Sequence, residues 1–552
     1  MSSRSARLTR RLLHDSPLRH KTYRTYYIAS IAAAMGYTMQ GTIAAWLMAT
    51  LTPSELMVAL VQTASMLPTL LFGLVAGSLA DIVDRRKVLI ITQTLLIAAT
   101  ALLGLAEIFG TVSSVWLLAA TFIIGAGFTF YMPAQQASLS DMVSKQELPQ
   151  ALGLGSAGFN VSRAVGPALA GVLTTLAGSG VALLLSALCF ALMIHAVRGW
   201  KKVPATIPGV PERVLPGIQS GLRYARHSPL MLALLARNFL FCLCAAALWA
   251  LLPVIARDKL LLGADGFGLL LACFGVGGIL ASLTVPRRVA QFGLNTMVNV
   301  GTCLWVAMNL VLAWSPYAPL SMVAMFFAGI AWICVMSAIW AGVQSAAPAW
   351  VRARSVSMVL VVMQATLALS SIFWGWLAGA QGIGISLATA AGLMLALLLL
   401  TLRMKVHMGD EADVTPYGRI PELAIKSEPL PDDGPVLIQI HYHIDPKNQR
   451  DFLRAIRASE ATRRRNGASD WRVFRDLGEP GLFVERFIIT SWAEYVRLRA
   501  RMSLADRHVH EAFEQFQKPG HEIRITRMLS THLRDTDEHG DSDETPAATP
   551  SA

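Results

Sequence analysis

Long apolar stretches separated by short polar loops fill the first 402 residues of the chain. A helix needs about 20 apolar residues to cross the roughly 30 Å apolar core of a bilayer. Twelve stretches reach about this length, and each predicts a membrane-spanning helix. They cover residues 25–49, 56–80, 88–109, 112–137, 152–177, 180–198, 230–256, 265–285, 293–313, 318–342, 356–379 and 382–402. The first is too long for the apolar part of a signal peptide, so we expect it to be retained.

The pattern changes after residue 402. Residues 403–435 predict a linker, because Asp410 to Pro435 is rich in acids and proline. Residues 436–530 read as βαββαβ, with strands at 436–444, 471–477, 482–489 and 521–529, which predicts a ferredoxin-like fold. We therefore expect an all-α polytopic membrane domain followed by a small α+β domain. The predicted parts are a basic cytoplasmic segment (1–24), two six-helix bundles (25–198 and 230–402), a cytoplasmic central loop (199–229), the linker, the ferredoxin-like domain and a disordered acidic tail (531–552).

Composition supports this division. Of the 552 residues, 54% are hydrophobic and 15% are charged, against about 25% charged in an average soluble protein. This excludes a disordered chain and an ordinary soluble enzyme. The net charge of +12 would suit nucleic-acid binding, but residues 1–402 hold 25 basic and only ten acidic side chains. The excess of positive charge thus belongs to the apolar part.

The basic residues lie mostly in alternate loops. One side of the predicted membrane domain has basic residues at 4–24, 85–87, 145, 198–226, 287–288 and 352–354, whereas the other has only Arg257 and Lys259. Cytoplasmic loops carry the excess of Lys and Arg. We therefore expect a multi-pass protein of a bacterial inner membrane with both termini in the cytoplasm, in contact with lipid and not with nucleic acid.

The sequence contains no evident metal or cofactor site. All six cysteines lie in predicted spans, and Cys242 and Cys244 form no zinc-like pair of pairs. His508 and His510 are two residues apart and cannot share a helix face, although His441 and His443 share one face of a strand. No phosphate-binding loop ending in Lys-Ser or Lys-Thr is present. We expect no metal, no cofactor, no ATP-driven step and no enzyme activity.

The loop after the second span has a recognisable pattern. Gly77-x-x-x-Asp81-x-x-x-Arg85-Arg86 resembles the signature loop of the major facilitator superfamily, and the resemblance covers residues 20–402. It implies the twelve-helix major facilitator fold and a conformational latch made by Asp81, Arg85, Arg86 and Asp141. Asp84 stands where the family usually has Gly. A weaker copy of the loop, with Arg287 and Arg288 but without the acid, follows the eighth span.

A narrower resemblance runs from Tyr131 to Val172. This stretch is similar to the enterobactin-exporter-like branch of the superfamily, which is of the transmembrane secretion effector type. Members of that branch export siderophores, drugs or metabolites. Within it, Gly166-Pro167-x-x-x-Gly171 resembles a motif of antiporters, in which small residues let helices approach closely. The C-terminal domain resembles dimeric α/β barrels of small monooxygenases. This resemblance implies a homodimer or a regulatory role, with catalysis as the alternative.

Polar residues inside predicted spans are candidates for a substrate cavity, because each is costly in a membrane. Arg163 lies about 16 Å into the fifth span, and Asn160 lies one turn earlier on the same face. Both could line a cavity, or Arg163 could bond to helix carbonyls. Arg237 could face the cavity or reach the headgroups. The remaining candidates, each equally consistent with interhelical hydrogen bonds, are Gln40, Gln62, Gln135, Asn238 and Gln364. The aromatic and Met residues of the spans could line an apolar cavity, although such residues more often face lipid or pack between helices; they are Phe130, Tyr131, Met132, Trp249, Trp305, Trp332 and Trp340.

None of the ten acids in residues 1–402 falls at mid-depth. A cavity carboxylate is the usual means of binding an organic cation, so the sequence favours a neutral or anionic substrate facing Arg163. With the family resemblance, we expect proton-motive-force-driven efflux of a small molecule by alternating access. The titratable candidates for proton coupling are Asp81, Glu107 and His195. Uptake, or a membrane-tethered sensor or enzyme acting through its C-terminal domain, are the alternatives.

Overall fold

The computed structural model describes residues 16–144, 146–200, 221–404, 406–410, 414–415, 417 and 429–530. These residues form two compact units. The first unit holds 16–200, Ala233–Val343 and Val356–Met408, and the second holds 221–232, Gln344–Ser355 and the described residues from 409 to 530. The predicted N-terminal segment before residue 16, the central loop at 201–220, most of the linker and the tail at 531–552 lie outside the described residues.

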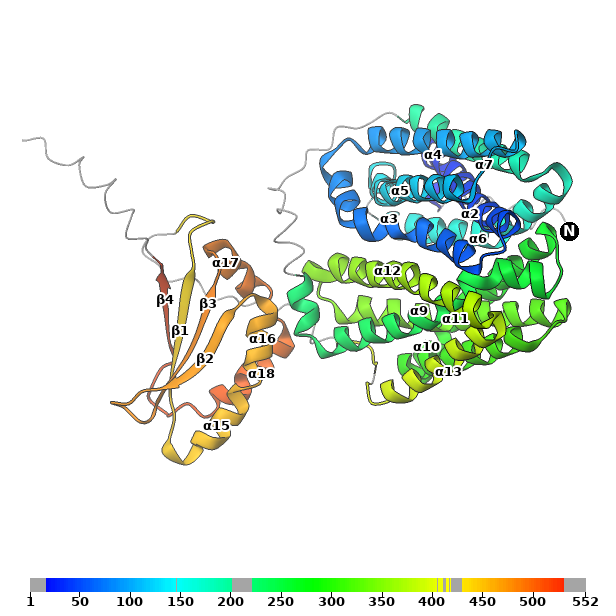
Figure 1. Ribbon diagram of the computed structural model, residues 1–552. Helices are drawn as coiled ribbons and strands as arrows, with labels where there is room; N and C mark the ends of the chain where they lie inside the picture. Colours follow the sequence, from blue (N-terminus) through cyan, green and yellow to red (C-terminus); the bar gives the residue numbers. More distant parts are fainter. Residues whose placement is uncertain are drawn as a thin grey trace, which may run out of the picture. The chain divides into compact units, whose positions relative to one another are not determined.

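The first unit is a bundle of long helices (Figure 1). Helices α2 to α7 form one group and helices α9 to α13 form another beside it. Every one of the twelve predicted stretches is helical. The helices are α2 (Lys21–Leu51), α3 (Glu55–Ile82), α4 (Arg85–Ile108), α5 (Ser114–Ser138), α6 (Leu148–Ala177), α7 (Ser179–Arg198), α9 (Pro229–Val254), α10 (Ala264–Trp314), α11 (Ala318–Ala346), α12 (Ala349–Gln381) and α13 (Ile383–Thr401).

Ten helical segments of the described chain are long and apolar enough to cross a membrane. The long α2 and α6, of 31 and 30 residues, are not among these ten, and they pack against each other. Helix α10 contains two of the ten segments because it runs on through the predicted eighth loop to Gly293, where φ is 78°. The prediction of a polytopic all-α domain is confirmed.

Short polar side chains set where several helices begin. Ser54 accepts a hydrogen bond from the backbone N–H of Met57, and Ser113 accepts one from that of Trp116. Asp84 accepts one from the N–H of Arg86 at 3.0 Å and so caps α4. Such N-caps satisfy donors that have no partner within the helix. Because φ at Asp84 is −55°, this position does not require Gly, which accounts for the departure from the family pattern.

The two helix groups contact each other near one end of the bundle. We call the end at the α3–α4 connection (83–84) the basic end, and the end at the α2–α3 connection (52–54) the opposite end. Towards the opposite end, Thr63 Oγ1 donates to the carbonyl of Ala368 at 2.7 Å, and Arg257 Nη1 donates to that of Thr52 at 3.0 Å. Trp46 also stacks on Phe267, with ring centroids 5.8 Å apart.

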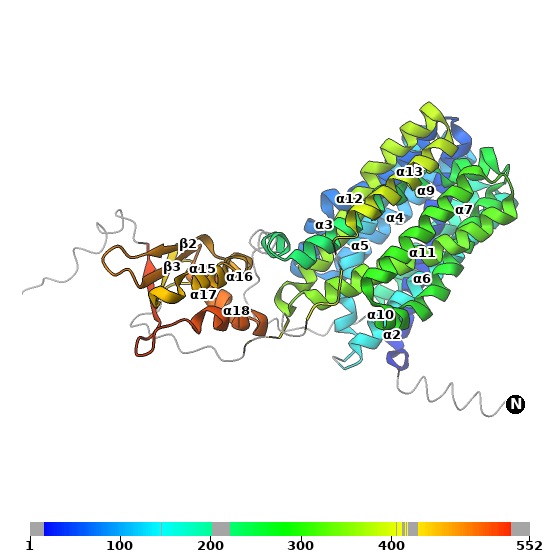
Figure 2. The ribbon, with the colours of Figure 1, turned by 90° about the horizontal axis from the view of Figure 1, so that it is seen from below.

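The second unit contains a four-stranded antiparallel sheet in the order β2-β3-β1-β4. Helices cover one face of it (Figure 2), and alternate residues of β1 and β3 are buried there. This is the predicted ferredoxin-like arrangement, and the prediction is confirmed. The elements are β1 (Val436–His443), α15 (Gln449–Ile456), α16 (Ser459–Asn466), β2 (Ser469–Arg475), β3 (Leu482–Ile489), α17 (Trp492–Ala500), α18 (Leu504–Glu514) and β4 (Arg524–Leu529).

Candidate functional site

A cavity of about 220 Å³ lies between the two helix groups of the first unit. Helices α2, α3 and α6 contribute its walls on one side, and α9, α10 and α11 contribute those on the other. Its polar and aromatic lining residues are Tyr37, Thr38, Thr42, Gln62, Ser65, Asn160, Arg163, Trp249, Phe267, Phe274 and Trp332. A cavity between the two halves is where alternating access requires a substrate site.

Arg163 reaches this cavity because α6 is held tightly against α2. Thr38 Oγ1 donates to the carbonyl of Ser162 at 3.0 Å. A Cβ on Gly166 would lie 2.1 Å from Thr38 Oγ1, so only Gly allows α6 to come this close to α2. Asn160 and Arg163, one turn apart, both line the cavity. Within the described residues, the Arg163 side chain has neither an ion-pair nor a hydrogen-bond partner.

The rest of the predicted motif brings α6 against α10. A Cβ on Gly171 would lie 2.5 Å from the carbonyl oxygen of Ala264, and one on Gly268 would lie 2.5 Å from that of Pro167. One on Gly275 would lie 2.4 Å from the Cα of Ala164. We call these residues of α6 and α10 the glycine seal. It joins the two halves with almost no side chain between them, as small residues allow.

Five of the predicted polar cavity residues do not line the cavity, namely Gln40, Gln135, Arg237, Asn238 and Gln364, and neither do Phe130, Tyr131, Met132, Trp305 and Trp340. Arg237 is buried, and it donates to Asn299 at 2.5 Å, to Asn295 at 3.0 Å and to the carbonyls of Thr401 and Met404 at 2.7 and 3.1 Å. It thus ties α9 to α10 and to the end of α13, instead of facing the cavity or the headgroups.

The other four also lie outside the cavity lining. Asn238 donates to the carbonyl of Val359 at 3.1 Å. Gln40 is buried beside the apolar core around Met39 and Ile43, whereas Gln135 and Gln364 are half-buried. Depth along a helix can be read from the sequence, but the direction of a side chain depends on packing. Tyr37, Ser65, Phe267 and Phe274 line the cavity without having been predicted to do so, since nothing sets them apart from other span residues.

The predicted latch residues form contacts within the first helix group. Arg85 Nη1 lies 3.0 Å from Asp141 Oδ1 and also donates to the carbonyl of Ala137 at 3.0 Å. Arg86 Nη2 donates to the carbonyl of Arg198 at 2.8 Å. The side chain of Asp81 lies outside the described residues. The described contacts therefore join α4 to the end of α5 and to the end of α7 at the basic end.

Comparison with known proteins agrees with this architecture. A family model described as transmembrane secretion effector matches residues 14–536 of the chain. The chain belongs to this family of major facilitator transporters. The membrane-embedded transporter domain is thus expected to bind a small-molecule substrate within a lipid bilayer, since the family and its relatives are transporters.

Several relatives of this transporter have names that state a function. It is 27% identical over 388 residues to the multidrug efflux pump Tap of Mycolicibacterium fortuitum, covering 67% of this chain and 92% of that one. It is 25% identical to the staphyloferrin A transporter of Staphylococcus aureus, over 47% of this chain and 66% of that one. It is 24% identical to macrolide efflux protein A of Streptococcus pyogenes, over 38% and 52% respectively.

Solved structures share the fold at low identity. A bacterial homologue of the human lysosomal transporter Spinster, in its inward-facing unoccupied form, matches with a TM-score of 0.56 and 15% identity, covering 70% of this chain and 98% of that one. The nucleoside transporter NupG matches with a TM-score of 0.55 and 14% identity, over 69% and 98%. These matches support the fold of the transporter.

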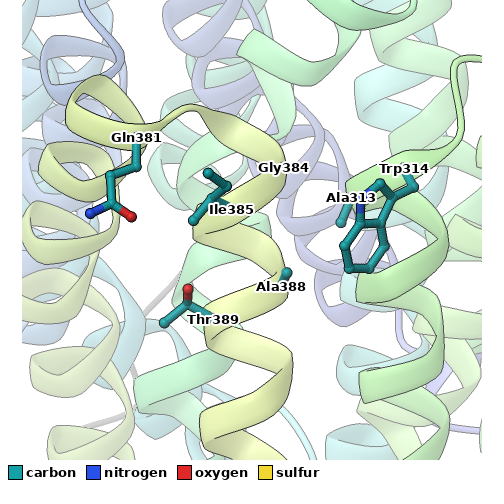
Figure 3. Close-up of a pocket in the computed structure, with 7 residues that line it drawn as sticks. All are labelled: Ala313, Trp314, Gln381, Gly384, Ile385, Ala388 and Thr389. Carbon is teal, nitrogen blue, oxygen red and sulfur yellow. The ribbon is translucent and has the colours of Figure 1, made fainter.

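A second hollow in the transporter is a poorer candidate for a site (Figure 3). In it the indole of Trp314 on α10 faces α13. No ionisable side chain lines it, and Trp314 is 66% exposed. Tryptophan is common where a membrane meets water. Its lining residues are Ala313, Trp314, Gln381, Gly384, Ile385, Ala388 and Thr389.

The second unit of the transporter has a buried charged cluster beneath its helices. Glu485 on β3 is fully buried and accepts hydrogen bonds from Arg463 at 3.0 Å, Trp471 at 2.8 Å and Tyr442 at 3.0 Å. Burial alone would raise the pKa of Glu485, but the charge and hydrogen bonds of Arg463 and the bond from Trp471 outweigh it and lower the pKa. With its acceptor oxygens satisfied, this cluster has the character of a structural element.

Metal binding finds no support in the part of the transporter that is described. Its residues contain no group of three or more His, Cys, Asp or Glu side chains that could hold a metal ion. His510 is buried beside the charged cluster, and burial, with the charge of Arg463, lowers its pKa to about 3. A histidine held neutral in this way packs as part of the core.

The second unit also includes two segments from the helix connections. Glu494 on α17 accepts hydrogen bonds from Arg223 at 2.8 Å and from Arg501 at 2.7 Å. The Arg501 guanidinium lies 4.2 Å from the ring centroid of Trp350. Tyr224 packs edge-on against the same Trp350 ring and donates to the carbonyl of Ala346 at 2.7 Å. The segment before α9 and the α11–α12 connection are therefore held to the ferredoxin-like domain.

Proposed function

We propose that the chain exports a neutral or anionic small molecule by alternating access, driven by the proton motive force. The observation that carries this proposal is the Arg163 guanidinium, which lines the central cavity without a partner among the described residues. The described cavity lining contains no carboxylate. An unpaired cation in a low-dielectric cavity favours an anion and disfavours a cation.

Export is the direction that the relatives favour. Two of them are named efflux proteins and the family is described as a secretion effector. Uptake by the same fold remains the alternative, because the cavity would bind a substrate arriving from either side.

Vesicle transport tests the proposal. In everted vesicles energised by a proton gradient, we expect accumulation of members of a dye and metabolite panel that includes the anion fluorescein, but not of the cation ethidium. A protonophore should abolish it. Arg163→Ala should lower the rate at least about tenfold, as expected for loss of a charged hydrogen-bonding group, and Arg163→Lys should restore part of it. Normal transport by Arg163→Ala would remove the cargo role, and accumulation only in right-side-out vesicles would indicate uptake.

The state changes are proposed to occur at the two ends of the bundle. In the described state the glycine seal and the Thr63–Ala368 hydrogen bond hold the halves together towards the opposite end. At the basic end, Asp81, Arg85, Arg86 and Asp141 are the proposed latch, of which the Arg85–Asp141 pair is formed here. Charge-neutral variants of this pair should change the transport rate without changing equilibrium binding of cargo to the open cavity.

The proton carrier is proposed among Asp81, Glu107 and His195. Glu107 accepts a hydrogen bond from Ser179 at 2.8 Å, which joins α4 to α7 at the opposite end. His195 is exposed near the end of α7. Glu107→Gln and His195→Gln should be assayed for transport with and without a pH gradient, because loss of the gradient dependence alone identifies a coupling residue.

The orientation and the tail complete the proposal. The basic end is proposed to face the cytoplasm of a bacterial inner membrane together with both termini, which reporter fusions to residues 1 and 552 would test. The uncovered sheet face of the ferredoxin-like domain, with Phe474 and Met528 over 40% exposed, is proposed to pair two copies of the chain. Deletion of residues 430–552 should then yield monomers in detergent, while transport that survives the deletion would leave the tail accessory.

A further inference from the structure

The two halves contribute different chemistry to the cavity. Every amide or charged side chain in its described lining comes from the first helix group, namely Gln62, Asn160 and Arg163. The second group contributes an aromatic wall of Trp249, Phe267, Phe274 and Trp332, together with aliphatic residues and glycine. A ligand between the halves therefore meets hydrogen-bonding groups on one side and apolar rings on the other.

The aromatic wall is built before any ligand arrives. The ring of Trp249 packs edge-on against Phe274, with centroids 4.9 Å apart, and against Trp332 at 5.7 Å. Behind them the fully buried Trp305 contacts Trp332 at 5.7 Å and Phe274 at 6.4 Å. Each contact has a favourable edge-to-face or tilted geometry. Such a rigid surface suits a flat apolar group, since little order is lost on binding.

Several polar groups at the cavity lack partners among the described residues, including the buried indole Nε1 of Trp249 in the wall. Gln62 Nε2 contacts only the sulfur of Met66, at 3.3 Å, among the described residues, and Arg163 has no partner within them. Both side chains are half-buried and line the cavity, so their N–H groups are open to a ligand. A ligand carboxylate could accept two hydrogen bonds from the planar guanidinium at once. An anionic group on a ligand would supply the partner that Arg163 lacks among the described residues.

Cavity size limits the ligand further. Its volume of about 220 Å³ is below the roughly 300–1,000 Å³ that is typical for drug-sized ligands. A small ring system with one acidic group suits this space better than a macrocycle.

We infer that the cargo is a small aromatic carboxylate, with its acidic end on Arg163 of the first half and its ring against the aromatic wall of the second. The inference rests on the proposed function for the role of the cavity, and it adds the chemical class and the orientation. A ligand held in this way bridges the two halves. Neither a purely apolar molecule nor a small acid without a ring satisfies both sides.

Calorimetry on the purified full chain in detergent tests this inference with three probes: 2-naphthoate, its neutral counterpart 2-naphthylmethanol, and acetate. We expect 2-naphthoate to bind at least about tenfold more tightly than the alcohol, and acetate not to bind measurably. Arg163→Gln should reduce 2-naphthoate to the affinity of the alcohol and leave the alcohol unchanged. Arg163→Lys should recover part of the preference. Trp249→Leu should weaken both naphthalene probes by a similar factor.

The matched control is Lys87→Gln, which removes an exposed positive charge from α4 and should change no affinity. A melting curve of each variant confirms that it is folded. Equal binding of acid and alcohol to the wild type, an acid preference that persists in Arg163→Gln, or binding of neither naphthalene probe would each overturn the inference. Equilibrium binding depends neither on a proton gradient nor on the direction of transport, so it tests the cargo class separately from the proposed export. If vesicles export other panel members but 2-naphthoate does not bind, the proposed function stands and this inference fails. If 2-naphthoate binds as expected but vesicles export no panel member, this inference stands and the proposed function fails.

Discussion

Two intramembrane arginines of this chain have opposite surroundings. Arg237 donates to two asparagines and to two carbonyl oxygens at the end of α13, where a cation also complements the helix dipole. Arg163 lines a cavity with no such partners among the described residues. The sequence gives both the same chemistry and a similar depth, so only the packing of neighbouring helices separates a structural arginine from a candidate ligand contact.

Replacing Arg237 by Met should destabilise the transporter. The substitution removes hydrogen bonds that join three helices and leaves buried carbonyls unpaired, at a cost of about 2–4 kcal/mol. The melting temperature in detergent measures this effect. Arg163→Met is the matched comparison, and it should melt close to the wild type because it breaks no described contact. Equal destabilisation of the two variants would contradict the distinction drawn between them.

His510 should make the ferredoxin-like domain sensitive to acid. Its pKa in the folded domain, about 3, lies below the ordinary histidine pKa of 6.5, so the unfolded chain binds a proton that the folded domain excludes. The contribution of His510 to the free energy of unfolding is fully present above pH 6.5 and is lost as the pH falls. At pH 5 the free energy of unfolding is lower by about 2 kcal/mol. Glu485, whose pKa is also lowered, adds to the loss only below about pH 4.5.

Hydrogen exchange of β3 in the full chain, corrected for intrinsic rates, measures this loss between pH 7 and pH 5. His510→Gln should remove most of the pH dependence, because its side chain does not titrate. A pH dependence that is unchanged in this variant would assign the effect to other groups.

At the scale of helices and strands, periodicity was enough to predict most of the fold. The twelve apolar stretches and the βαββαβ order depend on local patterns, and all are present in the structure. Helix α10 departs from the expectation because Pro286 and the two arginines after it continue the helix, and the chain breaks only at Gly293. The glycine seal illustrates the limit of such reasoning, since the motif on α6 indicates close packing but does not name α10 as the partner.

The seal should be sensitive to a single methyl group. Gly171→Ala places a Cβ 2.5 Å from the Ala264 carbonyl, so α6 and α10 must separate. We expect greater labelling of an Ala45→Cys cavity residue by an impermeant maleimide applied from the opposite end, and slower transport. Gly153→Ala, on the same helix, has nothing within 4 Å of the added methyl group and should leave both unchanged. Equal labelling in the two variants would show that the seal does not control access.

At the scale of the whole molecule, the chain divides into units that do not follow its order. The segment before α9 and the α11–α12 connection belong with the ferredoxin-like domain, although the sequence places them in a loop and between spans. Contacts between residues more than 250 positions apart, such as Arg223 with Glu494, leave no local pattern. For this reason the ferredoxin-like domain could be predicted from the sequence, but its contacts with residues 221–232 and 344–355 could not.

Glu494→Gln should loosen this assembly. Burial alone would raise the pKa of Glu494, but the charges of Arg501 and Arg223 outweigh it and lower the pKa, so the substitution removes a charge that both arginines bind. Hydrogen exchange should become about tenfold faster in residues 221–228 and 344–355, in line with the loss of charged hydrogen bonds. Glu511→Gln, which affects only an exposed pair with Arg507, is the control. Unchanged exchange in Glu494→Gln would mean that aromatic packing alone holds the segments.

Helix α6 carries both Arg163 and Gly171, eight residues or about 12 Å apart along one axis. Pro167 lies between them and has no N–H to pair with the carbonyl four residues earlier. Helix α6 therefore lacks one backbone hydrogen bond between Arg163 and Gly171. Pro167 thus gives α6 a place at which it can bend. If cargo binds Arg163 as proposed, α6 itself links the cargo to the glycine seal, and the bend at Pro167 sets how far a movement at Arg163 displaces Gly171.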